Sequence, residues 1–229
     1  WALLFLTRTV YQNAFATFMA DGFDINPSLI NIPTLHESEL QQLALNKGFS
    51  LPDNPRFVSR LSNLFYLREY LINYDDIDRK GNLRDFTDKL WLKKICGSLQ
   101  KDGMDTQRDR HMIEIVKRRA DSGYFYIDAA DLRQDVLFAL RQDEILGLDL
   151  SRNEYFISHD IYEEWALNKI VDRSWRKIGE VPAFFSAIGD SLPIRRAFRM
   201  WLSDELMECD DEIPQIIPDT FKESSIPDF

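Results

Sequence analysis

This sequence has few cysteines and fewer basic than acidic residues, and each of these two shortages excludes a class of protein. The 229 residues include two cysteines, Cys96 and Cys209. Their wide separation does not fit a zinc knuckle and indicates a reducing, intracellular setting. Lys and Arg number 28 against 38 Asp and Glu, for a formal net charge of -10. This charge opposes general binding to nucleic acid or anionic lipid, because phosphate contacts need a basic face.

Long apolar stretches and phosphate-binding loops are also missing. No apolar run approaches the roughly 20 residues that a membrane-spanning helix needs, so we expect no membrane partner and a cytoplasmic location. No Gly-x-x-x-x-Gly-Lys-Ser/Thr loop occurs, and no apolar strand ends in the paired acids that hold Mg²⁺. Without that cradle and that metal site, the chain alone is expected to bind ATP poorly and to hydrolyse none.

Residues 1–33 predict the end of a parallel α/β sheet. Ala2 to Arg8 is a continuous apolar run that ends in polar residues, which is typical of a buried strand. Val10 to Ala20 predicts a helix that Asp21-Gly22 stops, and Ser28 to Pro33 predicts a second strand. Strand, helix and strand suggest the closing βαβ unit of a sheet whose earlier strands lie upstream. We therefore expect the chain to be a piece of a longer protein.

Residues 34–122 predict a helical domain. Glycines that can adopt the left-handed conformation, Gly48 and Gly123, are expected to end its first and last helices. Pro55 stands in the first turn of the second helix, where its missing N–H has no cost. The expected helices run from Thr34 or Ser38, as cap, to Asn46, from Asn54-Pro55 to Ile72, from Arg84 to Leu99, and from Thr106 to Ala120.

Residues 123–172 predict a winged-helix domain, in which a helix is followed by a β-hairpin, the wing, and then by a closing helix. Aromatic and β-branched residues favour the strands, and the oxygens of Ser158 and Asp160 can cap the closing helix. The expected elements are a β-prone link at Tyr124–Ile127, a helix capped by Asp128 or Asp131 that reaches Ile145, strands at Gly147–Leu150 and Tyr155–Ile157 around the turn Ser151-Arg152-Asn153, and a helix over His159–Asp172.

Residues 173–208 predict a further helical segment, with two or three helices around Pro182–Ile188 and Leu192–Met207. Arg195 to Trp201 is the one basic and aromatic cluster. We interpret it as a helix that buries Phe198 and Trp201 and leaves its arginines solvated or paired. A phosphate or an acidic partner for these arginines is the alternative. The acidic, proline-containing tail at 209–229 is expected to be extended or partly disordered.

Three short motifs, in this order along the chain, resemble those of a known family. Trp1-Ala2-Leu3-Leu4-Phe5-Leu6-Thr7-Arg8 is similar to a strand that places a sensor arginine near the γ-phosphate. Leu51-Pro52-Asp53-Asn54-Pro55 is similar to a helix start whose proline packs against adenine, although Asn54 replaces a glycine of the plant form. His159-Asp160, where the wing meets the next helix, resembles a pair whose histidine touches bound nucleotide. Together they resemble the STAND-class P-loop ATPases of the NACHT and NB-ARC type.

The resemblance implies that this chain is the regulatory part of a nucleotide switch. Arg8, Pro55 and His159 are then the nucleotide-binding residues, and His159 meets the β-phosphate of ADP. The alternative for His159 is a helix-capping or exposed histidine. The parent protein is expected to be an ATPase that holds ATP or ADP with Mg²⁺ through an upstream P-loop region, whereas this chain alone is no enzyme. In the family, ADP holds an off state, and ATP exchange on sensing a protein trigger leads to self-association. Bacterial signalling and antiphage defence are settings in which such switches work.

Two other functions stay open. A winged helix can bind DNA, as in origin-recognition ATPases, but the helix expected before the wing carries four acids against two arginines, which is unfavourable for phosphates. Its charged residues are Asp131, Asp135, Asp143 and Glu144, with Arg133 and Arg141. The second is a helical adaptor without a ligand. The strand expected at Ala2–Arg8 and the expected hairpin count against this interpretation.

Catalytic and metal-binding interpretations are weaker. Ser158-His159-Asp160 has the residue types of a hydrolase triad, but adjacent residues cannot point at one another as a proton relay requires. His111 and Glu114 share a helix face at a spacing that suits a metal pair. With three histidines in the chain and no third ligand nearby, we expect a solvated helix face instead.

Overall fold

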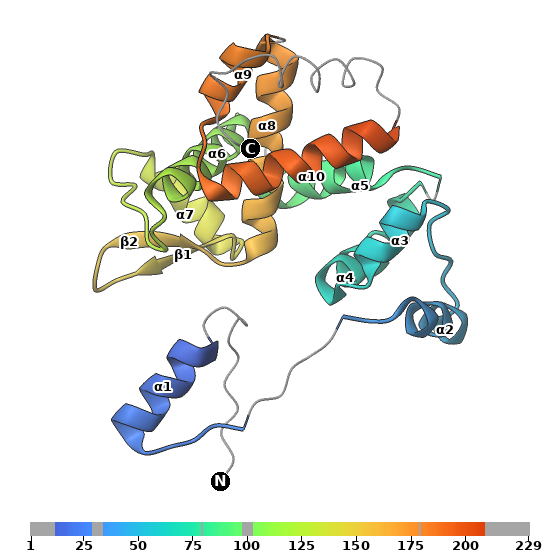
Figure 1. The fold of residues 1–229 in the computed structure, drawn as a ribbon, viewed down its shortest axis with the longest axis horizontal. Coiled ribbons are helices and arrows are strands. Elements are labelled where there is room, and N and C mark those ends of the chain that lie inside the picture. The colour runs from blue at the N-terminus through green and yellow to red at the C-terminus, as the bar shows by residue number, and fades with distance from the viewer. Residues whose placement is uncertain (1–11, 29–33, 79, 98–102, 179, 209–229) are drawn as a thin grey trace. The chain divides into compact units, whose positions relative to one another are not determined.

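A computed structural model describes residues 12–28, 34–78, 80–97, 103–178 and 180–208 (Figure 1). These ranges are mainly helical, with ten α-helices and one two-stranded antiparallel sheet. None of the helices they contain is long and apolar enough to cross a membrane. The expected strands at Ala2–Arg8 and Ser28–Pro33 fall on residues outside this description, so the parallel sheet stays a prediction, as does the form of the tail at 209–229.

The chain divides into two compact units, Trp1–Tyr74 and Asp75–Phe229. The division falls within the range that we expected as one helical domain. The finer boundaries after residues 33, 122, 172 and 208 stay predictions.

The first unit contains four described helices, and their ends correct several predictions. Helix α1 was expected to stop at Asp21-Gly22, but it continues to Phe23. The N–H of Asp24 (φ 54°) then donates to the Ala20 carbonyl at 3.0 Å. The helices are α1 (Gln12–Phe23), α2 (Glu37–Lys47), α3 (Pro55–Leu61) and α4 (Leu64–Ile72).

Helix α2 begins neither at Thr34 nor at Ser38. His36 is its N-cap residue, and the Glu39 carboxylate accepts the His36 N–H at 2.7 Å. Acidic side chains in the first turn also suit the positive end of the helix dipole. Gly48 ends the helix in the left-handed conformation (φ 74°), which confirms the prediction made for it.

Helix α3 begins as predicted, but it does not reach Ile72. The Asn54 side chain accepts the N–H groups of Arg56 at 2.9 Å and of Phe57 at 3.3 Å. The Asn63 side chain does the same for Phe65 at 2.9 Å and starts a new helix, α4. The prediction of a single helix is wrong here, because the asparagine side chain offers the backbone N–H at the break an alternative hydrogen-bond acceptor.

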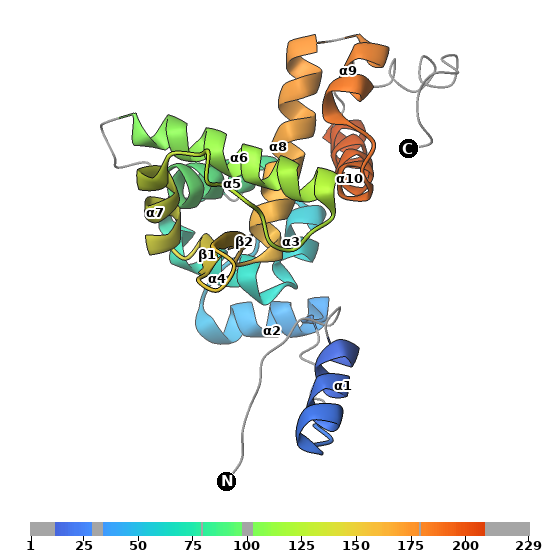
Figure 2. The same cartoon turned by 90° about the vertical axis from the view of Figure 1, so that its left-hand side faces the viewer.

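The second unit is built around α8, which packs against α6, α9 and α10 (Figures 1 and 2). Both helices expected after residue 172 are present, and they bury Phe198 and Trp201 as predicted. The elements are α5 (Leu83–Leu90), a π-helical turn (Trp91–Cys96), α6 (Met104–Ser122), α7 (Gln134–Gln142), β1 (Leu146–Asp149), β2 (Glu154–Ile157), α8 (Asp160–Ile178), α9 (Val181–Ile188) and α10 (Leu192–Glu208).

The helix expected from Arg84 to Leu99 is α-helical as far as Leu90 and becomes π-helical at Trp91. Six residues form the π-helical turn, and Gly97 follows it in the left-handed conformation (φ 69°). Buried Arg108 donates from Nε to the Ile95 carbonyl at 2.6 Å and from Nη2 to the Lys94 carbonyl at 3.0 Å. The arginine thus satisfies carbonyls that the end of a helix leaves without partners.

The predicted β-hairpin is confirmed. Strands β1 and β2 pair in antiparallel register from Leu146↔Ile157 to Asp149↔Glu154. On the other edge of β2, Ile127 and Tyr155 exchange two backbone hydrogen bonds of 2.8 and 2.9 Å. Strand β2 therefore has a backbone partner on both sides, and the β-prone link at Tyr124–Ile127 supplies one of them.

Helix α7 begins at Gln134, with Arg133 as its N-cap residue, so neither Asp128 nor Asp131 caps it. Asp131 instead receives two hydrogen bonds from Arg118, at 2.6 and 2.7 Å, which lower the pKa of the Asp131 carboxyl to about 2. The prediction was wrong because an arginine on α6, 13 residues earlier, takes the carboxylate.

Candidate functional site

His159 lies where β2 ends and α8 begins, and its imidazole is exposed. Its Nδ1 accepts the Ile161 N–H at 3.2 Å, so His159 caps α8, a role that we expected for Ser158 and Asp160. In the neutral ring this bond places the proton on Nε2. The ring also meets Tyr162 edge to face, with centroids 6.0 Å apart. Backbone and aromatic neighbours thus fix the orientation of this side chain.

The three predicted nucleotide-binding residues are described to different degrees. Arg8 lies outside the described residues. Pro55 is exposed in the first turn of α3, in the first unit, and His159 belongs to the second unit. Pro55 and His159 are each described within their own unit, so the joint nucleotide site of the three residues stays a prediction.

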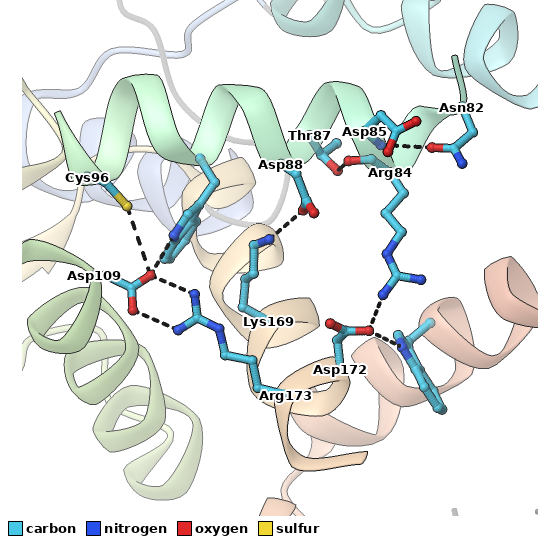
Figure 3. Close-up of polar contacts among 12 residues, drawn as sticks. Asn82, Arg84, Asp85, Thr87, Asp88, Cys96, Asp109, Lys169, Asp172 and Arg173 are labelled. Carbon is cyan, nitrogen blue, oxygen red and sulfur yellow. Dashed lines mark hydrogen bonds and ion pairs between the residues drawn. The ribbon is translucent and has the colours of Figure 1, made fainter. Parts of the chain in front are cut away.

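The second unit contains a polar cluster around Arg84 of α5, and Figure 3 shows its contact with Asp172. Its guanidinium pairs with Asp172 on α8 and with Glu205 on α10, and the Trp201 Nε1–H donates to Asp172 at 3.3 Å. Burial by itself lowers the pKa of Arg84, but the two carboxylates outweigh it and raise that pKa above its ordinary value. The guanidinium is therefore a permanent positive charge between three helices.

A second cluster lies around Asp109 of α6 (Figure 3). Arg173 of α8 donates two hydrogen bonds of 2.7 Å to its carboxylate, and the Trp91 Nε1–H donates a third at 2.7 Å. Burial raises the pKa of Asp109, but the bonds from Arg173 and Trp91 prevail and hold it below its ordinary value. On the same side of α8, Lys169 pairs with Asp88 of α5.

Cys96 lies next to this carboxylate, with Sγ 4.0 Å from Asp109 Oδ1. Burial, followed by the negative charge of Asp109, raises the pKa of its thiol to about 11. A thiol that stays protonated at neutral pH is a poor nucleophile and a poor metal ligand. Cys96 is therefore a structural residue.

His111 is buried, so the solvated position that we expected for it is wrong, whereas the Glu114 side chain is half exposed. Its Nδ1 lies 2.8 Å from the Gln107 carbonyl and its Nε2 accepts the Arg133 N–H at 3.1 Å. Glu114 pairs with Arg118 at 2.8 Å. No group of three or more potential ligands is found among the described residues, and both nitrogens of His111 already have partners.

The clusters around Arg84 and Asp109 were missed at the level of sequence. The chain offers one signal, which is that Lys169, Asp172 and Arg173 interrupt a helix rich in buried apolar residues. Their charged partners on α5 and α6 lie 64 to 88 residues away, so no local spacing identifies them.

Comparisons with known proteins found no family model that matches this chain, and no curated protein with a significant match to it.

Proposed function

We propose that this chain is the regulatory part of a STAND-type nucleotide switch in which His159 holds the ADP-bound off state. The supporting observation is the position of an exposed imidazole, oriented by its cap to Ile161, between a hairpin and a long helix. An imidazole N–H can donate a hydrogen bond to a phosphate oxygen. The nucleotide, Mg²⁺ and the P-loop belong to an upstream region, and this chain alone has no ATPase activity.

The fold around His159 supports a winged-helix interpretation. Helices α6 and α7 precede the hairpin, and β2 pairs with β1 on one edge and with Ile127 on the other. The two-stranded hairpin thus follows two helices, with a turn at residues 150–153 as the wing tip, and the isolated bridge from Ile127, between α6 and α7, extends it by one residue pair. In the proposed off state, this winged helix contacts bound ADP. The parent protein is then a cytoplasmic, bacterial defence or signalling protein.

The polar clusters suggest how a signal at His159 reaches the rest of the unit. Helix α8 begins beside His159 and carries Asp172 and Arg173, which bind α5, α6 and α10. Fixed ion pairs and buried apolar contacts make these helices move together. Exchange of ADP for ATP then releases these helices together and not a single loop. The released helices self-associate after a protein trigger.

DNA binding is a weaker candidate because of the surface of α7. The arginine at its start, Arg133, is paired with Asp135 at 2.5 Å, and Phe138 is exposed one turn later. A neutralised arginine and an exposed phenyl ring do not make the basic face that phosphate contacts need.

The test is nucleotide affinity, measured by calorimetry on a protein that carries this chain with its upstream nucleotide-binding region. His159→Asn keeps a helix-capping side chain and removes the imidazole, while His159→Ala removes both. We expect both variants to bind ADP about tenfold or more weakly, as loss of a hydrogen bond to a charged group predicts, with ATP affinity little changed.

His36→Ala is the matched control, since it removes an exposed histidine at the start of another helix. It should leave both affinities unchanged. Equal ADP affinities in the His159 variants and the wild type would falsify the proposed role of His159.

A further inference from the structure

Helix α10 has two faces of different chemistry. The inner face is buried against the rest of the second unit and contains Ile194, Ala197, Phe198 and Trp201, with Glu205 paired to Arg84. Residues at the opposite positions, spaced by three and four, are all exposed: Leu192, Arg196, Arg199, Ser203, Leu206 and Met207. This spacing makes one continuous stripe along the helix, which we call the outer face of α10.

The outer face is cationic at its centre and apolar at both ends. Leu192 is 67% exposed at one end, and Leu206 and Met207 are 40% and 65% exposed at the other. Between them stand Arg196 and Arg199, and no carboxylate in the described part of the chain is paired with either. Arg195, in contrast, donates to the Asp190 carbonyl at 2.7 Å. The two arginines thus remain a local positive charge on a chain whose net charge is -10.

The size and the mixed character of this face decide what kind of ligand fits. From Leu192 to Met207 the stripe is about 22 Å long, at 1.5 Å per residue. A nucleic acid or an anionic membrane is bound by many cations, whereas this face carries two. Leucine and methionine side chains instead need apolar partners, which a protein helix carries beside its own charges.

We propose that the outer face of α10 is a docking surface for an acidic, amphipathic helix of a partner protein. Carboxylates of the partner pair with Arg196 and Arg199, and apolar side chains on either side of them pack on Leu192 and on Leu206 and Met207. Arginine suits this contact because its guanidinium can meet a carboxylate with two hydrogen bonds. Docking at this face requires no nucleotide.

The experiment uses the whole chain and a fluorescently labelled synthetic helix of about 15 residues, long enough to span the stripe. Leucines form one side of this probe and glutamates flank them; a second probe carries lysines in place of the glutamates. Fluorescence anisotropy then compares the wild type with the double variant Arg196→Glu/Arg199→Glu. The matched control is Arg110→Glu/Lys117→Glu, which makes the same change of charge at two exposed positions of α6. Circular dichroism confirms that each variant is folded.

We expect the acidic probe to bind the wild type and the α6 control alike, and to bind the α10 variant about tenfold or more weakly. The α10 variant should gain affinity for the lysine probe. Any of the following results overturns the proposal: no binding of the acidic probe, an equal loss in the α6 control, or tighter binding of a single-stranded oligonucleotide at the same arginines. Self-association of the chain through Arg196 and Arg199 without probe binding also overturns it, because the occupant is then a second copy.

Discussion

Single buried polar side chains hold neighbouring helices of the second unit in place. His111 joins α6 to the start of α7, and Arg108 joins α6 to the π-helical turn before it. Arg108 also pairs with Asp143, at the end of α7, at 2.6 Å. Each side chain uses several of its polar atoms at once, which is how buried polar groups avoid the cost of lost hydration.

At the residue scale we predict that His111→Phe loosens the start of α7. The phenyl ring fills much of the space of the imidazole but leaves the Arg133 N–H without its acceptor, at a cost of about 1–3 kcal/mol. Hydrogen exchange of the Arg133 amide should accelerate, and the urea midpoint of the second unit should fall. His159→Asn, at an exposed capping position, is the comparison and should change the midpoint little. Unchanged exchange at Arg133 in His111→Phe contradicts the role given to His111.

Among the elements, the hairpin shows how a glycine fixes a strand pair. Gly147 of β1 is opposite Phe156 of β2, and a Cβ atom at Gly147 would lie 2.1 Å from Phe156 Cζ. The Phe156 ring therefore covers the glycine and stacks on Phe125, with centroids 5.6 Å apart. The contact between the Phe156 ring and Gly147 therefore stabilises the wing together with the backbone hydrogen bonds between β1 and β2.

We predict that Gly147→Ala destabilises the wing by about 1–3 kcal/mol, because the added methyl group displaces a packed ring. Adding Phe156→Ala should cost less in the Gly147→Ala background than in the wild type, since the clash is then removed. Thermal unfolding followed by circular dichroism measures all four proteins. Gly22→Ala, where nothing lies within 4 Å of the added Cβ, is the control and should not destabilise. If the double variant loses as much stability as the two single variants together, a clash with the Phe156 ring does not explain the effect of Gly147→Ala.

Local signals in the sequence predicted the elements that local chemistry determines. Gly48 and Gly123 end helices because the left-handed conformation favours glycine, and Asn54 caps α3 through its own side chain. The cap of α7 and the π-helical turn could not be predicted in this way, because Arg118 and Arg108 act on them from another helix. Among the candidate site residues, the sequence predicted His159 at the strand-to-helix junction, and the helix cap that was its alternative role there is present.

On the scale of the whole second unit, ion pairs between distant residues organise the helices around α8. Asp172 pairs with Arg84 from 88 residues earlier, and Glu205 reaches the same arginine across 121 residues. Partners so far apart leave no pattern of spacing, which is why the clusters were not predicted. Half-buried ion pairs of this kind stabilise less than their geometry suggests, but losing one partner leaves the other charge poorly solvated.

We predict that the second unit loses stability in acid partly through Asp109. Its pKa is below the ordinary value in the folded protein, so the bonds from Arg173 and Trp91 contribute fully above the unfolded value of 3.8 and are lost as the pH falls below it. The difference in melting temperature between the wild type and Asp109→Asn should therefore be largest near neutral pH and should shrink below pH 3.8. A difference that is constant with pH assigns the stability to the shape of the side chain and not to its charge.

The position of α10 at the end of the described chain has a consequence for synthesis. A ribosome delivers α5, α6 and α8 before it delivers Leu192–Glu208, and domains complete their cores only when the last element is present. Until then, Trp175 lacks its neighbour Trp201 at 6.2 Å, and Arg84 lacks Glu205. A nascent chain that stalls before α10 thus leaves an aromatic ring and a guanidinium without the neighbours that α10 supplies.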